Sequence, residues 1–174
     1  MLIKGRFNIL ILTILLAIIN SCGYHFADKG ESLPSDIKKI AIPFFINKTF
    51  EPRVEIFITD AFIDEFLKRG KVRIVKSGDA DATILGKIKS FKTNPISFDD
   101  NDRVLEYRAT VVLDITLKRN DTGQIIWESF SVKDEQEYPV SSNRTNTYFN
   151  KKEAIKKIAK DMAEDIHNSI FEVF

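Results

Sequence analysis

Few side chains in this sequence are of the types that carry out catalysis. The 174 residues include one cysteine and two histidines, and neither His25 nor His167 has neighbours at the spacing of a zinc motif. The seven glycines are scattered and form no phosphate-binding loop. Asp79 and Asp81 lie close together, but the other oxygen ligands of a calcium loop are missing. We therefore expect a protein that is not an enzyme and binds no metal, with both histidines as ordinary polar surface residues.

The single cysteine follows an apolar N-terminal segment, at a position where a cysteine can be acylated. Lys4 and Arg6 precede an apolar run over residues 7–19, which has the order of a secretory signal and is too short to cross a hydrocarbon core about 30 Å thick. The run leads into Ile-Asn-Ser-Cys at residues 19–22, which resembles the lipobox of bacterial lipoproteins. Cleavage before Cys22 would leave a thiol and a new amine, and two or three acyl chains on these groups would hold the chain stably to a membrane. Apart from these covalent acyl chains, we expect no cofactor.

The mature chain that this cleavage would produce is nearly neutral. Loss of Lys4 and Arg6 leaves 24 basic against 25 acidic side chains, which argues against nucleic acid as a partner. Gly23 follows the cysteine, at the position where Asp marks lipoproteins that stay in the inner membrane, so the resemblance to lipoproteins implies an outer-membrane address. We expect residues 1–21 to be a signal peptide, residues 22–36 a lipidated tether and residues 37–174 a single domain.

Hydrophobic periodicity predicts strands and helices in the order βαββββα. Strands are expected over residues 37–46, 71–76, 82–91, 104–118 and 124–133. In the first of them, Ile40, Ile42 and Phe44 share one side, and Pro43 indicates an edge strand or a bulge. Helices are expected from Pro52 to Arg69, with Gly70 as C-cap, and over residues 151–173. Polar connections are expected over residues 92–103 and 135–150, and a turn over residues 120–123.

These elements suit a two-layer α+β sandwich. The strand at residues 104–118 alternates apolar and polar residues along its length, so one of its faces should meet a core. Two helices with one apolar face each can cover one side of a sheet. We expect a mixed sheet of about four or five strands with both helices packed on one face.

The segment that follows the cysteine resembles one lipoprotein family. Cys-Gly-Tyr-His-Phe at residues 22–26 is similar to the mature start of the lipopolysaccharide-assembly lipoproteins of the LptE type. Further pieces resemble this family in their order and spacing, namely residues 33–34, 37–43, 47–52, 69–70, 80–86 and 106–108. The resemblance implies a lipid-anchored outer-membrane protein, with its domain on the periplasmic side or in the lumen of a β-barrel of the LptD type. There it would plug the translocon and help it to assemble and to insert lipopolysaccharide into the outer leaflet.

The resemblance also implies contact between basic residues and lipopolysaccharide, since Arg and Lys pair with phosphate oxygens. The candidates are Lys87, Lys89, Lys92, Arg103, Arg108 and Arg144. The alternative is that these are solvated sheet charges, with Arg108 beside Glu106 or a cross-strand carboxylate. Three acidic residues, Asp99, Asp100 and Asp102, argue against phosphate binding at the tip of the loop after Phe91.

A plug must present surface to the barrel that encloses it. The candidates for this interface, expected in loops, are Phe98, Tyr138, Pro139, Tyr148 and Phe149. Exposed aromatic groups suit a protein interface. The alternative is that these side chains fold back over the core.

Two other classes of function stay open. Residues 37–49 also resemble the opening of curli-secretion-type and peptidoglycan-synthase-activator lipoproteins, which would make this a secretion lipoprotein or a lipid-anchored periplasmic activator. A secretion pore would need added membrane hairpins of about 9–11 residues per strand, and the sequence has one long alternating strand. The third class is a periplasmic enzyme carried on a lipid anchor.

Overall fold

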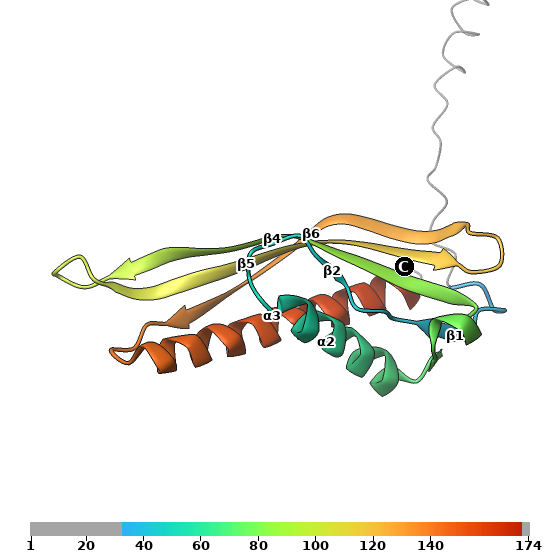
Figure 1. Ribbon diagram of the computed structural model, residues 1–174, viewed down its shortest axis with the longest axis horizontal. Coiled ribbons are helices and arrows are strands. Elements are labelled where there is room, and N and C mark those ends of the chain that lie inside the picture. The colour runs from blue at the N-terminus through green and yellow to red at the C-terminus, as the bar shows by residue number, and fades with distance from the viewer. Residues whose placement is uncertain (1–32, 172–174) are drawn as a thin grey trace, which may run out of the picture. The chain divides into compact units, whose positions relative to one another are not determined.

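The computed structural model describes residues 33–171, so the predicted signal peptide, Cys22 and most of the predicted tether lie outside the described residues. A sheet forms one layer and two helices form the other, both on the same face of the sheet (Figure 1). The strands are β1 (Lys39–Ala41), β2 (Ile46–Asn47), β3 (Arg73–Ile74), β4 (Ala82–Phe98), β5 (Val104–Arg119) and β6 (Ile125–Pro139). The helices are α2 (Val54–Arg69) and α3 (Arg144–Phe171), with a short 3-10 turn, η1, at Ser77–Asp79. The predicted two-layer α+β architecture is confirmed.

The sheet is mixed and has the order β3-β1-β4-β5-β6. β1 pairs in parallel with β3 and β4, while β4, β5 and β6 form an antiparallel meander. β2 also pairs in parallel with β4, farther along that strand than β1. The sheet therefore has six strands rather than four or five, because the first predicted strand is split into β1 and β2.

The split occurs around Pro43 and reverses the faces of the residues beyond it. Residues 42–45 leave the ladder, and the N–H of Phe45 donates instead to Oγ1 of buried Thr59 in α2 at 3.0 Å. Phe45 is buried and Phe44 is 69% exposed, so the expectation that Phe44 shares the side of Ile40 is wrong. A shift of one residue moves every following side chain to the other face. Of the two expectations for Pro43, the irregularity is therefore confirmed, while the edge position is wrong for β1, which has a strand on each side.

Two strands and one helix are longer than predicted. β4 continues to Phe98, β6 continues to Pro139, and α3 begins at Arg144, so most of the predicted connections are regular structure. β4 and β5 pair almost to their common turn, where they extend past the start of α3 (Figure 1). Ladder hydrogen bonds between main-chain groups need no apolar face there, so hydrophobic alternation does not reveal them.

The ends of α2 and the β5–β6 turn follow the sequence closely. Gly70 has φ 64° and donates its N–H to the carbonyl oxygen of Phe66 at 3.3 Å, which confirms the predicted C-cap. The helix starts at Val54, two residues after Pro52, because Arg53 takes a left-handed conformation with φ 67°. Gly123 has φ 73° and donates to the carbonyl oxygen of Arg119, which confirms the predicted turn.

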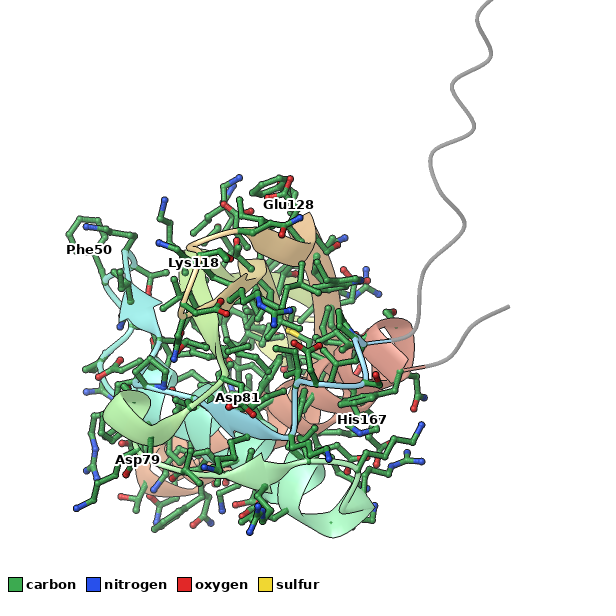
Figure 2. The ribbon with its side chains drawn as sticks, turned by 90° about the vertical axis from the view of Figure 1, so that its right-hand side faces the viewer. Phe50, Asp79, Asp81, Lys118, Glu128 and His167 are labelled. Carbon is green, nitrogen blue, oxygen red and sulfur yellow. The ribbon has the colours of Figure 1, made fainter. Side chains whose placement is uncertain are left out.

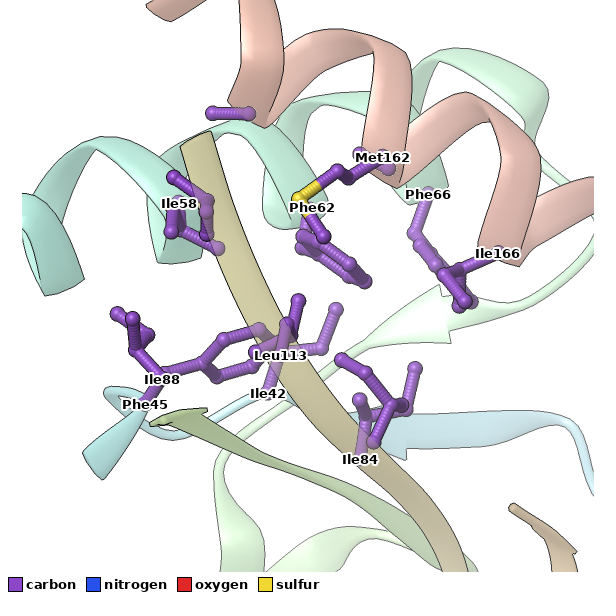
Figure 3. Packing of buried hydrophobic residues seen from close by; sticks show 14 of the residues in the cluster. Ile42, Phe45, Ile58, Phe62, Phe66, Ile84, Ile88, Leu113, Met162 and Ile166 are labelled. Atoms are coloured by element: carbon purple, nitrogen blue, oxygen red, sulfur yellow. The ribbon is translucent and has the colours of Figure 1, made fainter. Parts of the chain in front are cut away.

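The core lies between the sheet and the two helices. Alternate residues of β5 from Ala109 to Leu117 are fully buried, and they meet Phe62 and Phe66 of α2 and Met162 of α3 (Figure 3). Burial of one such large side chain contributes about 1.5–3 kcal/mol. The remaining fully buried large residues are Ile40, Ile58, Ile84, Ile88, Ile155 and Ile158. The sheet thus buries one face, and its other face is left free of helices.

Gly86 is required where strand β4 passes the ring of Phe45 in this core. A Cβ atom at residue 86 would lie 2.3 Å from Cδ2 of Phe45. The Phe45 ring itself packs edge-on against Phe62, with ring centroids 4.9 Å apart. Only glycine allows the β4 backbone and this ring to approach so closely.

Candidate functional site on the helix-free face of the sheet

Strand register places four of the predicted basic residues on the sheet face that the helices leave uncovered. In an antiparallel ladder, residues directly opposite each other share a face. Lys87 lies opposite Asp114, and Lys92 lies opposite Thr110, while the alternate residues of β5 point into the core. Arg108 and Lys89 lie on this same face, which we call the open face, because they contact Glu137 and Asp114.

Two of these four cations are paired with carboxylates. Nη2 of Arg108 donates to Oε1 of Glu137 at 2.7 Å, and this hydrogen bond raises the pKa of Arg108 above its usual value. Nζ of Lys89 lies 3.4 Å from Oδ1 of Asp114 and donates to Oγ of Ser131 at 3.2 Å. Lys87 and Lys92 are exposed and have no ion pair within residues 33–171. Of the four predicted cations on the open face, two are therefore paired and two are available to an anion.

A bulge in β6 holds the Lys89 contact in place. Ser131 has φ 56°, and its N–H donates to Oδ1 of Asp114 at 2.8 Å. The pairing of β5 with β6 shifts at this point, between Leu113 and Ile115. Sequence analysis missed this bulge, which breaks the alternation of the expected strand over residues 124–133.

The other two predicted cations lie elsewhere. Arg103 closes the β4–β5 turn, where Oδ1 of Asp99 accepts N–H bonds from Asn101 and Arg103, both at 2.9 Å. Asp99 thus shapes the turn, which Asp102 completes with φ 60°. Arg144 is the first residue of α3. No contact within the described part of the chain joins Arg103 or Arg144 to the cations of the open face.

The aromatic candidates occupy strands and a helix, so their expected place in loops is wrong. Phe98 ends β4, and Tyr148 and Phe149 lie in the second turn of α3, with each of the three about half exposed. Pro139 ends β6 and is exposed. Tyr138 is only 5% exposed and stacks on Tyr107 with ring centroids 5.7 Å apart, and its burial raises its pKa. For Tyr138 the alternative to an interface residue is therefore confirmed, because its side chain folds back over the core.

Lysines of α3 bind its first turns to the rest of the domain. Nζ of Lys151 lies 2.7 Å from Oε1 of Glu51 and 5.9 Å from the centroid of Phe91. Nζ of Lys152 lies within 6 Å of the ring centroids of Phe57, Tyr148 and Phe149. Such cation–π contacts at partly exposed sites are worth about 0.5–1 kcal/mol each. These contacts favour the observed positions of the half-exposed aromatic rings of α3.

His167 is buried, so the expectation of a polar surface residue is wrong for it. Its side chain is 1% exposed and lies against Phe66 and Phe171, with ring centroids 5.0 and 4.5 Å away. Neither ring nitrogen has a hydrogen-bond partner among the described residues. Burial lowers the pKa of His167 below its usual value. The other histidine, His25, lies outside the described residues.

The hollows in the surface have mixed linings. One of about 490 Å³ lies between the helices, lined by acidic residues of α2 such as Asp60 and Asp64 and by Lys156 and Lys160 of α3. Another of about 460 Å³ is lined by Leu33, Val72 and Phe171 among other residues. Across residues 33–171 no group of three or more His, Cys, Asp or Glu is placed to hold a metal ion.

An exposed apolar stripe, which was not predicted, lies beside the open face. Phe44, Ile46 and Phe50 are exposed on β2 and the segments that flank it. Their spacing of two and four residues is a signal that the sequence does contain, hidden by the assumption that Phe44 faces the core.

No helix in the described range is both long enough and apolar enough to span a membrane.

Comparisons with solved structures and with protein families show which proteins this domain is similar to. The structure is similar to rare lipoprotein B of Shewanella oneidensis, with a TM-score of 0.51 and 12% identity over 76% of this chain and 93% of that one. It is also similar to a protein of Caulobacter crescentus described as a lipoprotein, with a TM-score of 0.52 and 10% identity over 72% of this chain and 86% of that one. These likenesses show a shared fold, and comparison with curated proteins gives no match. The model of one family, LptE, described as lipopolysaccharide-assembly, matches residues 37–170, and the chain therefore belongs to the LptE family.

Proposed function

We propose that this protein is an outer-membrane lipoprotein that plugs a β-barrel translocon of the LptD type, helps it to assemble and contacts the lipopolysaccharide that it inserts. The family match over residues 37–170 carries this proposal, since it covers both layers of the domain. The role is structural and not enzymatic. The family match also favours this function over the secretion and activator alternatives.

The anchor in this proposal is a set of acyl chains on Cys22. Fully extended chain spans about 3.3–3.6 Å per residue, so the segment from Cys22 to Leu33 can reach at most about 40 Å. This length keeps the domain close to the membrane surface. Metabolic labelling with palmitate should mark the wild-type protein and leave Cys22→Ala unlabelled. Acylated, membrane-associated Cys22→Ala would refute the anchor.

Two sets of side chains support contacts with the barrel and with lipopolysaccharide. Phe98, Tyr148 and Phe149 are large, half exposed and fixed in regular elements, which suits an interface. Of the four predicted cations on the open face, Lys87 and Lys92 have no carboxylate partner among the described residues, so they can pair with phosphate at no loss of an existing ion pair.

Extraction from the native host tests the plug. We would tag the full-length chain, solubilise the envelope in mild detergent and identify the proteins that remain bound after affinity purification. A large β-barrel protein recovered in about equal amount with the lipoprotein is the expected result. Recovery of the lipoprotein without any such barrel would refute the proposed function.

A further inference from the structure

The apolar stripe beside the open face has the form of an anchor for a protein partner. We call it the Phe50 surface and define it as Phe44, Ile46, Lys48 and Phe50, the exposed members of an alternating segment whose other members point inward. Phe44 and Ile46 are 69% and 54% exposed, and Phe50 is exposed along its whole side chain. Phe50 stands at the periphery of the domain, away from the core (Figure 2). Apolar side chains this exposed bury little area and so contribute little to the stability of the domain.

The loop that carries Phe50 is rigid. Oδ1 of Asn47 accepts from both the N–H and the hydroxyl of Thr49 at 2.8 Å. The amide nitrogen of the same Asn47 side chain donates to the carbonyl oxygen of Glu51 at 2.9 Å and to Oε2 of Glu55 at 2.8 Å. The N–H of Lys48 donates to the carbonyl oxygen of Ile88 in β4 at 3.0 Å. A loop whose backbone is already held in place loses little backbone conformational entropy when its exposed ring docks.

The rim of this surface is positively charged. Ile46 pairs with Lys87 across the sheet, and Lys48 and Lys87 have no ion pair within the described domain. The carboxylates around this surface are already engaged, because Glu51 pairs with Lys151, Glu55 accepts from Asn47, and Asp114, opposite Lys87, pairs with Lys89. A partner surface that is complementary to this one would carry carboxylates around an apolar pocket.

We propose that the Phe50 surface docks into an apolar pocket bordered by carboxylates on the barrel partner, with the Phe50 ring as its central anchor. This inference rests on the proposed function, which supplies the barrel. A hollow of about 380 Å³ beside Phe50, lined by Ser90, Phe91 and Thr93 among others, can receive a side chain of the partner in return. A protruding aromatic ring next to a hollow is typical of a hot spot in a protein–protein interface. An acyl chain would instead need a continuous apolar groove, so a protein partner is favoured over a lipid.

The test compares two exposed phenylalanines in the full-length tagged chain. Phe50→Ser is the variant, and Phe130→Ser is the matched control, since Phe130 is 62% exposed and lies on β6, two strands away from β4. After extraction of the native envelope in mild detergent, we expect the amount of barrel protein recovered with Phe50→Ser to be lower than with wild type by a factor of about ten or more. Phe130→Ser should stay within about twofold of wild type, and both variants should keep the melting temperature of wild type.

Charge reversal provides a second measurement. Lys48→Glu should lower barrel recovery more than Lys48→Gln, because it places a carboxylate against carboxylates. Equal recovery with the two Lys48 variants would contradict the acidic rim of the pocket.

The outcomes separate this inference from the proposed function. Recovery of no barrel with the wild-type chain would overturn both. Equal barrel recovery with wild type and Phe50→Ser would overturn the Phe50 anchor and leave the plug standing. The anchor would also be overturned if Phe50→Ser weakened binding to lipopolysaccharide micelles alone, or converted a wild-type dimer to a monomer, with barrel recovery unchanged.

Discussion

Protonation of His167 should destabilise the domain when the pH falls below about 6.5. The imidazole is almost completely buried between Phe66 and Phe171, and neither of its nitrogens has a hydrogen-bond partner in the described chain. Burial is the main cause that lowers its pKa. Asn168 and Glu65 act in the opposite direction, while Arg69 and Lys71 lower the pKa further by repulsion of the charged form, and the net shift is downward.

The sign and the size of this effect follow from proton linkage. The unfolded histidine has a pKa near 6.5, and the folded one has a lower pKa, so the unfolded chain binds more protons in the interval between them. The stability that the neutral ring provides is complete above about pH 6.5 and is lost as the pH falls toward the folded pKa. One titrating group can change the free energy of unfolding by at most about 1.4 kcal/mol per pH unit. For a domain of this size that is on the order of 5 °C in Tm per pH unit.

Thermal unfolding of the non-lipidated mature chain between pH 7.5 and 5.5 measures this effect. His167→Leu removes the titration while keeping an apolar side chain in the site. Wild type should lose Tm more steeply than His167→Leu as the pH falls, and the difference between the two slopes reports His167 alone. Parallel slopes, or a wild-type Tm that rises on acidification, would refute the assignment of a buried neutral imidazole.

Four further substitutions test the core, a partly buried carboxyl and the open face. Gly86→Ala should cost about 1–3 kcal/mol in chemical denaturation, because the new methyl group must displace the ring of Phe45. Burial raises the pKa of Asp134, and nearby carboxylates of α3 raise it further. The ionised side chain therefore opposes folding above that pKa. Asp134→Asn should raise the Tm at pH 7 but not at pH 3. Lys87→Ala should weaken lipopolysaccharide binding about three- to tenfold in a titration, and more than Arg108→Ala, since the charge of Arg108 is already met by Glu137. A larger loss with Arg108→Ala would contradict this ranking.

The elements that could be predicted from the sequence are those with one face in the core. The alternating residues of β5 from Ala109 to Leu117 are all fully buried, as their period of two indicates. The end of α2 is equally clear, because Lys68 and Arg69 complement the helix dipole and Gly70 takes the left-handed conformation. In each case local chemistry and burial agree.

The elements that could not be predicted have no buried face or depend on long-range pairing. β4 beyond Phe91 is exposed on most positions, so its ladder with β5 leaves no trace in the hydrophobic pattern. The contact between Arg108 and Glu137 joins residues 29 positions apart and exists only in one strand register. The alternative of a cross-strand carboxylate beside Arg108 is confirmed, and the register decides that this carboxylate is Glu137.

The break at Pro43 connects the core to the proposed docking surface. Proline lacks the N–H that a continuous strand would use, and the chain leaves the ladder for residues 42–45. The change of face brings Phe45 inward against Gly86 and turns Phe44 outward. The exposure of Phe44 and Ile46 is therefore a consequence of how Phe45 fills the core. A chain that kept an unbroken strand here would bury Phe44 and Ile46 instead, and it would lose the apolar part of the surface next to Phe50.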